Sequence, residues 1–330
     1  MRVLFISSSR LGDAILSTSI LQHLYTQHNN LRVTVACGAL PAPLFKLMPF
    51  VEQMHIIEKK SYARHWIDLW KKLRGESFDK VIDLRGTRLS YFLKTHKRYV
   101  WQSKKYKTGH QQERFQKLLD VQEPLAPSLW VKPGKNDSLT EPTLVVAPAA
   151  NWIGKQWPAS YFIEALRTFQ ETFQDAHVML LASPHEKAVT DEIMAGLDKE
   201  RTCAPVTNDL NKVGVAIAQS HLFFGNDSGL MHMAVALGVP CIGLFGPSDD
   251  TRYGPYGSQH ITLRTPLSLK EIESLPGFSY GAPTCYMETL TPDNVIPILI
   301  NQWRKVCPQS QTLAPLKVST PGPRHRSVQK

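Results

Sequence analysis

The sequence predicts an α/β protein made of two doubly wound domains, each with a parallel sheet. Short apolar runs alternate with amphipathic segments, which is the pattern of strands and crossover helices in such a sheet. The alternation stops between residues 121 and 142, where proline, serine, asparagine and lysine replace the periodic pattern and predict a linker. It then restarts, and a chain of 330 residues is long enough to form two cores.

The first predicted domain comprises residues 1–140. Its helices are predicted from apolar residues at helical spacing, and its strands from short apolar runs. The predicted strands span residues 2–7, 32–36, 54–57, 80–84 and 99–101, and the predicted helices span residues 13–27, 62–74 and 111–119.

The second predicted domain comprises residues 141–310. Its predicted strands span residues 143–147, 177–182, 221–224 and 239–245. Its predicted helices span residues 158–173, 184–197 and 210–219, with a further short helix from Ser228 that Gly238 closes. Residues 311–330 contain three prolines and little apolar content, and they are predicted to form a mobile tail.

The composition is that of a globular protein with an acidic partner. Hydrophobic residues make up 42% of the chain and charged residues 20%, which excludes a disordered or fibrous protein. The formal net charge of +10 favours a nucleic acid, an anionic membrane surface or a phosphorylated substrate as the partner. The five cysteines include no CxxC pair, so they indicate neither a zinc site nor a disulfide framework.

The sequence contains no predicted secretory or membrane-spanning segment. Arg10 and Asp13 interrupt the apolar N-terminus before a signal-peptide core can form, and no run of 18 apolar residues occurs. Any membrane role would therefore be peripheral, and the unpaired cysteines predict reduced thiols in the cytoplasm.

The segment from Asn226 to Pro247 is the most informative part of the chain. An apolar run leads into Asp227, Ser228 and Gly229, and a helix follows, so a polar turn lies at the carboxyl end of a strand. Ligands of open α/β sheets bind at that edge, and the free amides of a helix N-terminus attract phosphate. The alternative is that Asp227 or Ser228 only caps the helix and that His232 is a satisfied core histidine.

Asp13 lies where the first predicted strand gives way to the first helix. A carboxylate at this edge could act as a general base toward a hydroxyl nucleophile, which is worth roughly 10²–10⁴-fold in rate. The alternative is that Asp13 only caps the helix and complements its dipole. The segment has no GxGxxG, so it is not a dinucleotide-binding fingerprint.

Lys155 lies in the segment that links the first strand of the second domain to its first helix. At that edge its cation could meet a diphosphate, whereas a lone loop lysine is usually only solvated. The neighbouring Trp157 is predicted to pack rather than to bind a ligand.

A basic segment from Arg88 to Arg114 is interleaved with aromatic residues. It could bind nucleic acid, or it could bind the phosphates and carboxylates of an anionic lipid headgroup. A solvated face with no partner is the third interpretation.

Several signatures are missing from the sequence. It has no GxSxG elbow and no P-loop. It also has no Asp-x-Asp, the carboxylate pair that commonly holds a metal on a sugar-nucleotide diphosphate. A diphosphate would therefore be neutralised by helix N-termini and cations without Mg²⁺.

Together these segments resemble glycosyltransferase family 9, the heptosyltransferases that build the inner core of lipopolysaccharide. The match covers most of residues 1–300, and the segment 81–86 also looks like part of the family. Four landmarks match in order: Leu11-Gly-Asp13, then Lys155-x-Trp157-Pro158, then Asn226-Asp-Ser-Gly-x-x-His232 through Phe245-Gly-Pro247, and Cys285-Tyr-Met287 before Thr291-Pro292.

The resemblance implies a GT-B fold, in which two Rossmann-like domains face a central cleft, with the donor in the C-terminal domain and the acceptor in the N-terminal domain. It implies an inverting transfer of heptose from ADP-heptose to Kdo-lipid A or heptosyl-Kdo-lipid A, with no metal and no cofactor. Asp13 would deprotonate the acceptor hydroxyl, and Lys155 would meet the diphosphate.

The resemblance also implies two sets of binding residues. The donor site would comprise Asn151, Lys155, Asp227, Ser228, Gly229, Leu230 and His232. The anionic acceptor, at the cytoplasmic face of the inner membrane, would be bound by Arg10, Arg88, Lys94, Lys97 and Arg98.

The chain departs from the family at one position. Many members have an acidic residue near the start of the helix before the Asp-Ser-Gly strand, where it can bind the nucleotide ribose, and Asn211 stands there in this chain.

Two alternatives stay open. The same fold could use another sugar donor or acceptor, or the basic segment could bind nucleic acid, which would give Lys155 and Asp227 no role. Nucleic acid is not the expected partner, and the sequence makes no prediction about oligomers.

Overall fold

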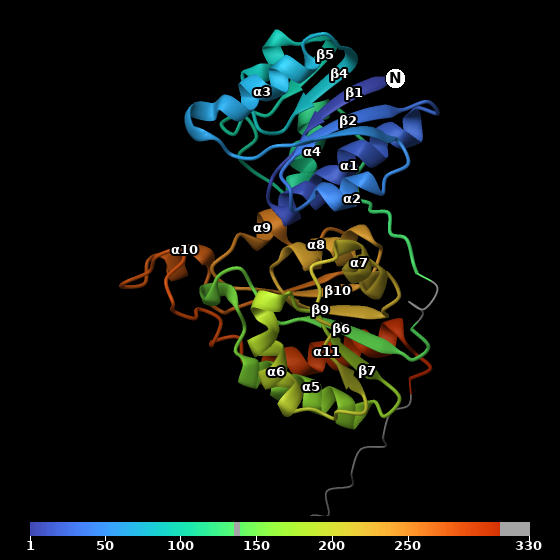
Figure 1. The fold of residues 1–330 in the computed structure, drawn as a ribbon. Helices are drawn as coiled ribbons and strands as arrows, with labels where there is room; N and C mark the ends of the chain where they lie inside the picture. Colours follow the sequence, from blue (N-terminus) through green and yellow to red (C-terminus); the bar gives the residue numbers. More distant parts are fainter. Residues whose placement is uncertain (135–138, 311–330) are drawn as a thin grey trace, which may run out of the picture.

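The computed structural model describes residues 1–134 and 139–310. It has two lobes, each built round one sheet, and the chain passes between them after residue 119 (Figure 1). The predicted tail, residues 311–330, and residues 135–138 of the predicted linker lie outside the described residues.

The N-terminal lobe contains a five-stranded sheet with the order β3-β2-β1-β4-β5, in which all neighbours are parallel. Its strands are β1 (Arg2–Ile6), β2 (Arg32–Cys37), β3 (Val51–Ile56), β4 (Ser77–Asp83) and β5 (Lys94–Val100). Its helices are α1 (Leu11–Gln27), α2 (Ala42–Lys46), α3 (Arg64–Leu73) and α4 (Gln111–Leu119), with 3₁₀ turns η1 (Ser61–Ala63) and η2 (Leu89–Phe92).

The C-terminal lobe contains a six-stranded parallel sheet with the order β11-β10-β9-β6-β7-β8. Its strands are β6 (Thr143–Ala147), β7 (His177–Leu180), β8 (Thr202–Cys203), β9 (Leu222–Asn226), β10 (Cys241–Phe245) and β11 (Ile261–Arg264). Its helices are α5 (Ala159–Thr172), α6 (Lys187–Ala195), α7 (Leu210–Ala218), α8 (Gly229–Ala236), α9 (Asp250–Tyr253), α10 (Leu269–Glu273) and α11 (Pro292–Val306), with 3₁₀ turns η3 (Ile153–Lys155) and η4 (Pro184–Glu186).

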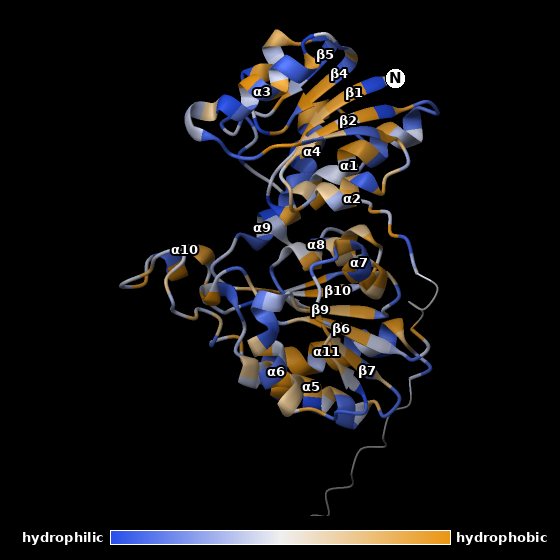
Figure 2. Cartoon of the chain, viewed as in Figure 1, coloured by the Kyte–Doolittle hydropathy of each residue, from blue (hydrophilic) through white to orange (hydrophobic). Residues whose placement is uncertain are grey.

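Both faces of each sheet are covered, as a doubly wound fold requires. In β1, Val3 and Phe5 pack into the cluster that contains α1, whereas Leu4 and Ile6 pack on the opposite face against α3. This alternation follows the period of two of a strand. In the C-terminal lobe, α7 and α8 cover one face, and α5 and α11 cover the other. The central strands are accordingly the most apolar parts of the chain (Figure 2).

The structure confirms the two-sheet α/β prediction and most of its elements. The predicted edge strand at residues 99–101 is longer than expected, because β5 begins at Lys94. An exposed edge strand with basic residues lacks the apolar run that identifies a buried strand. The elements α2, β8, β11, α9, α10 and α11 were not predicted from the sequence. Most of these are short, and α11 has Pro297 inside it.

The two lobes pack against each other through their helices. Figure 1 shows α1 and α2 facing α7 and α8, and α1 contacts α8 while α2 contacts α7. One apolar cluster is continuous across this contact, since it includes Ile15 and Leu16 of α1 together with Met231 and Ala234 of α8. The starts of α1 and α8, which follow strands in different lobes, are therefore brought together.

Candidate functional site

Two helix N-termini meet where the lobes touch. A Cβ atom on Gly12 would lie 2.9 Å from Cδ2 of His232, and one on Gly229 would lie 2.7 Å from Cδ2 of Leu11. Each helix therefore has a glycine where the other helix approaches it. The positive ends of two helix dipoles lie side by side at this point, which favours an anion between them.

Three backbone amides at the start of α8 are free. Ser228 is the N-cap, and its Oγ accepts a hydrogen bond from the amide of Met231 at 3.4 Å. The capping interpretation of Ser228 is therefore confirmed. Within residues 1–134 and 139–310, the amides of Ser228, Gly229 and Leu230 donate no hydrogen bond. Capping thus leaves three donors available for a ligand's oxygens.

Lys155 and Asp227 form an ion pair at the same edge. Nζ of Lys155 lies 3.2 Å from Oδ2 of Asp227, and the two side chains are only 17% and 11% exposed. The interpretation of Lys155 as a merely solvated loop lysine is therefore wrong. The ion pair places a cation beside the free amides of α8.

The structure adds Asn226 to the candidate site, a residue for which the sequence predicted no role of its own. Its side chain is fully buried, its Nδ2 donates to the carbonyl of Pro148 at 2.7 Å, and its Oδ1 accepts from the amide of Trp157 at 3.0 Å. These bonds tie the end of β9 to both ends of the loop that contains Lys155. Asn226 is a positioning residue for that lysine. Its place in the Asn226-Asp-Ser-Gly motif is the only sequence signal for it.

Asp13 lies in the first turn of α1, while Arg10 occupies the N-cap position. The interpretation of Asp13 as the N-cap is therefore wrong, although its charge complements the dipole. Burial raises the pKa of Asp13, against the opposing effects of Arg10 and Arg252 and of a hydrogen bond with Ser8. A raised pKa makes the carboxylate a stronger base, which suits proton abstraction.

His232 is buried, and its Nδ1 has no hydrogen-bond partner among the described residues. The interpretation of His232 as a satisfied core histidine is therefore wrong. Burial lowers the pKa of His232 to about 4, so its ring is neutral at physiological pH. A carbon of the ring packs against Gly12, and the ring's Nδ1 is left without a partner among the described residues.

The predicted acceptor residues do not form one surface. Lys94 and Arg98 lie on one face of β5, whereas the strand's alternation puts Lys97 on the other, with its ammonium over the ring of Tyr99. Arg98 donates to the carbonyls of Ser90 and Leu93.

The other two predicted acceptor cations lie apart from β5. Arg88 is exposed at the start of η2, and Arg10 lies close enough to Asp13 to act on its pKa. The acceptor role of all five cations stays a prediction.

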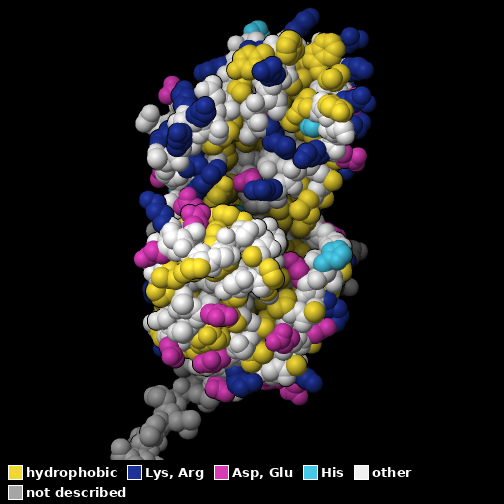
Figure 3. All heavy atoms as spheres, turned by 90° about the vertical axis from the view of Figure 1, so that its left-hand side faces the viewer, with side chains coloured by type: hydrophobic (Ala, Val, Ile, Leu, Met, Phe, Trp, Pro, Cys, Tyr) yellow, Lys and Arg dark blue, Asp and Glu magenta, His cyan; other side chains and the backbone are white. Residues whose placement is uncertain are grey.

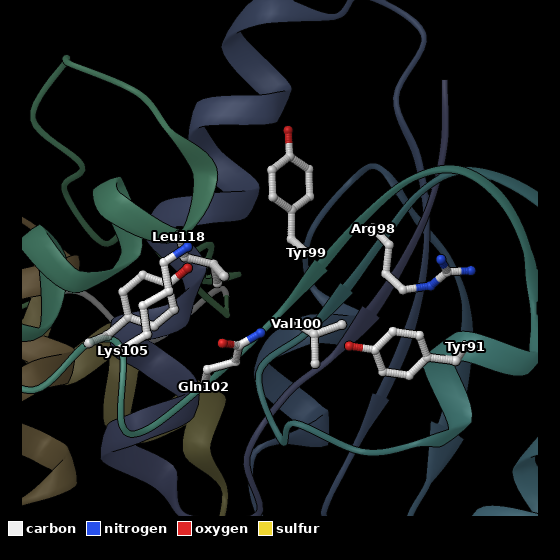
Figure 4. Close-up of a pocket in the computed structure, with 8 residues that line it drawn as sticks. Tyr91, Arg98, Tyr99, Val100, Gln102, Lys105 and Leu118 are labelled. Atoms are coloured by element: carbon white, nitrogen blue, oxygen red, sulfur yellow. The ribbon is translucent and has the colours of Figure 1, made fainter.

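A hollow of about 380 Å³ lies beside β5 (Figure 4). Arg98 and Tyr91 lie together on one side of it, with the guanidinium 5.4 Å from the ring centre, and Lys105 and Leu118 lie on the other. This hollow is basic and aromatic, so it suits an anionic sugar. Figure 3 shows lysine and arginine gathered over the N-terminal lobe on the face drawn, whereas acidic side chains lie mainly over the C-terminal lobe.

Three further predicted residues have clear positions. Trp157 is fully buried and donates from Nε1 to the carbonyl of Leu290, which confirms its packing role. Asn151 is exposed in the loop before η3, and its donor-binding role stays a prediction. The side chain of Asn211 accepts from the amide of Lys132 and donates to its carbonyl, so it holds the linker on α7.

Residues 1–134 and 139–310 contain neither a membrane-spanning helix nor a candidate metal cluster. No helix there is long and apolar enough to cross a bilayer. No group of three or more His, Cys, Asp or Glu side chains in these ranges could hold a metal ion.

Comparison with known proteins places the chain in a family. The model of glycosyltransferase family 9 (heptosyltransferase) matches residues 102–275. Lipopolysaccharide heptosyltransferase 2 of Salmonella typhimurium is 25% identical over 309 residues, which cover 80% of this chain and 88% of that protein. Lipooligosaccharide heptosyltransferase 2 of Campylobacter jejuni is 26% identical over 283 residues, which cover 77% and 84%.

Solved structures agree on the fold. The structure of E. coli ADP-heptose lipopolysaccharide heptosyltransferase II matches with a TM-score of 0.71 at 21% identity, covering 92% of this chain and 99% of that one. A family 9 glycosyltransferase from Veillonella parvula matches with a TM-score of 0.74 at 17% identity, covering 92% and 97%. The chain therefore belongs to glycosyltransferase family 9, the heptosyltransferases, and it is a transferase with the GT-B fold.

Proposed function

We propose that this chain transfers heptose from ADP-heptose to Kdo-lipid A or heptosyl-Kdo-lipid A in the inner core of lipopolysaccharide. The transfer inverts the anomeric centre and needs neither a metal nor a cofactor. The observation that supports this most is the meeting of the start of α1, which contains Asp13, with the start of α8, where the free amides and the Lys155–Asp227 pair lie. The names of the relatives supply the sugar and the acceptor class.

The donor's diphosphate binds at the start of α8. The amides of Ser228, Gly229 and Leu230 donate to its oxygens. Lys155 keeps its ion pair with Asp227 and also contacts the phosphate. Asp227 then contacts the heptose, and His232 supports the turn from behind. The exposed Asn151 meets the donor from the loop.

The acceptor hydroxyl approaches from the N-terminal lobe. Asp13 takes its proton as the hydroxyl oxygen attacks the anomeric carbon from the face opposite the diphosphate. The bond from that carbon to the diphosphate oxygen breaks, and its electron pair leaves with the nucleoside diphosphate. One displacement from the opposite face inverts the anomeric configuration.

Negative charge grows on the bridging oxygen during this displacement. Donors that already point at that oxygen stabilise it without reorganisation, and they act more strongly in a poorly hydrated site. The α8 amides and Lys155 neutralise the charge of the diphosphate, as a metal ion does in other glycosyltransferases. A metal is therefore not needed. The basic N-terminal lobe suits an acceptor rich in phosphates and carboxylates at the cytoplasmic face of the inner membrane.

A thermal-shift panel with ADP, UDP and GDP tests the donor. ADP at a hundred times its Kd is expected to stabilise the folded protein by about 2.7 kcal/mol, whereas UDP and GDP have little effect. Equal stabilisation by all three would contradict an ADP-linked donor. The test matters because Asn211, which is bonded to Lys132, replaces the acidic residue that can bind the nucleotide ribose in many members of the family.

A transfer assay tests the reaction. ADP-heptose and Kdo-lipid A or heptosyl-Kdo-lipid A are expected to give a product one heptose heavier by mass spectrometry, with undiminished rate in EDTA. NMR of the new linkage reports inversion. Loss of turnover in EDTA, or retention of configuration, would contradict the proposed mechanism.

A further inference from the structure

A second, smaller hollow lies between the lobes, with a volume of about 220 Å³. Its lining comes from the segment after β5, from α4 and from α9 of the other lobe: Trp101, Ser103, Tyr106, Lys107, Arg114 and Arg252. Tyr106 also lines the hollow of Figure 4, so the two hollows are neighbours. Three of these side chains are cationic, and none is acidic.

Arg114 is unusual because it is a buried arginine without an ion pair. It is only 5% exposed, and it forms no salt bridge with any described residue. One Nη atom donates to the carbonyl of Lys107, but Nε is buried and has no hydrogen-bond partner within the described ranges. An unpaired buried donor on a charged group is costly, so the group is expected to have a ligand.

Arg252 approaches the same hollow from the C-terminal lobe. Its Nε donates to Oε1 of Gln111 at 3.1 Å, and its guanidinium lies 4.7 Å from the ring centre of Tyr253. It has no ion pair with a described residue either. Oδ1 of Asp249 accepts from the amide of Arg252 and from the hydroxyl of Thr251, and the charge of this carboxylate raises the pKa of Arg114 without forming an ion pair with either arginine.

The two guanidinium groups are close enough to repel each other. Burial lowers the pKa of Arg114, and the charge of Arg252 lowers it further. The charges of Asp13, Arg252, Arg114 and Arg10 all act on Tyr253, so the hollow lies near the predicted catalytic base. Arg252 also acts on the pKa of Asp13 itself.

We propose that Arg114 and Arg252, with the exposed Lys107, form an anion-binding subsite that spans the two lobes and holds a carboxylate or phosphate of the acceptor beside Asp13. Two planar guanidinium groups suit the oxygens of either anion, because they donate in a fixed fork. The anion supplies the missing partner of Arg114 and cancels the repulsion. Since each lobe contributes one arginine, acceptor binding also holds the lobes together.

The acceptor part of this inference rests on the proposed function. The experiment therefore has one arm that tests anion binding without relying on that function. In the first arm, inorganic phosphate is titrated in a thermal-shift assay. It is expected to stabilise the wild type more than Arg252→Gln and Arg114→Gln, in which only the α8 amides and Lys155 remain to bind it. Lys117→Gln is the matched control, because Lys117 is an exposed cation on the same α4 helix.

In the second arm, KM is measured separately for donor and acceptor. Arg252→Gln is expected to raise the acceptor KM by roughly tenfold or more, since a hydrogen bond to a charged group is lost, with little change in the donor KM. Lys117→Gln should change neither. Arg252 is half-buried, so its variant keeps the proposal testable if Arg114→Gln fails to fold.

Each outcome has a distinct meaning. Phosphate stabilisation that is equal in wild type and both arginine variants would overturn the subsite. Weaker phosphate stabilisation in the arginine variants with an unchanged acceptor KM would support an anion site but overturn the acceptor as its source, in favour of free phosphate. If no transfer occurs with any acceptor, the proposed function fails, while the phosphate arm still decides on the subsite.

Discussion

Two aspartates at the meeting point of the lobes have unlike environments. Asp227 is paired with Lys155, whereas Asp13 forms no ion pair with a described residue and burial raises its pKa. Burial keeps the proton affinity of Asp13 high despite the opposing charges of Arg10 and Arg252. Asp13 is thus the better base, and Asp227 is the better group to hold a sugar and a lysine in place.

Asp13→Asn is expected to lower kcat by roughly 10²–10⁴-fold, because the amide cannot take the proton. ADP binding should persist, since the amides of α8 are unchanged. Steady-state kinetics and an ADP titration measure the two effects. Full activity in the variant would remove Asp13 from the mechanism.

The same substitution is expected to raise the melting temperature. A carboxyl whose pKa is raised in the folded state contributes stability that is present below its unfolded pKa and is lost as the pH rises through the folded pKa. At neutral pH the ionised group therefore costs stability, and the neutral amide removes that cost. A lower melting temperature for Asp13→Asn would contradict the buried-charge account.

The pH dependence of the reaction follows from the same shift. The base must be ionised, so kcat/KM is expected to fall on acidification at a pH above that at which an ordinary aspartate protonates. The measurement is kcat/KM against pH, with circular dichroism over the same range to separate inactivation from unfolding. An acid limb at or below the ordinary range would show that Asp13 is not the titrating base.

Lys155→Ala is expected to cost about 3 kcal/mol of transition-state stabilisation, as the loss of one oxyanion donor does. The measurement is kcat/KM for the donor. Lys187→Ala is a suitable control, because Lys187 is also ion-paired with an aspartate but is exposed on α6. Equal effects of the two variants would contradict a role for Lys155 at the diphosphate.

At the scale of elements, the site is made by the turns that follow β1, β6 and β9. The turn after β9 supplies Asp227 and the α8 amides, and the loop after β6 supplies Lys155. Asn226 joins these two turns through hydrogen bonds to backbone atoms. The relative position of the lysine and the amides thus depends on one buried side chain.

Asn226→Ala is expected to destabilise the fold by about 1–3 kcal/mol, because it leaves a buried amide and a buried carbonyl without their partner. Urea unfolding measures the change. Asn151→Ala removes an exposed asparagine from the same loop and should have little effect on stability. If both substitutions are equally mild, Asn226 does not hold the loop.

The sequence predicted the elements better than the contacts between them. Helix starts are recognisable from local signals, such as Pro158 before α5 and Ser228 before α8. Asn226 and Arg252 were missed because their partners are distant: Pro148 is 78 residues from Asn226, and Gln111 is 141 residues from Arg252. No local pattern predicts such pairs.

At the scale of the whole molecule, catalysis depends on how the lobes meet. The apolar cluster through α1 and α8 brings two helix N-termini together, and Gly12 and Gly229 let them approach. The doubly wound sheets and the ligand edge were predictable from apolar periodicity. The distribution of the basic residues over both faces of β5 could not be predicted in the same way. The predicted edge strand began five residues too late to show their alternation.

A crystal structure with ADP-heptose bound to Asp13→Asn tests the central claim most directly. The account predicts diphosphate oxygens within hydrogen-bonding distance of the amides of Ser228, Gly229 and Leu230 and of Nζ of Lys155, with residue 13 facing the anomeric carbon from the other side. A diphosphate bound elsewhere, or residue 13 turned away from the sugar, would contradict it.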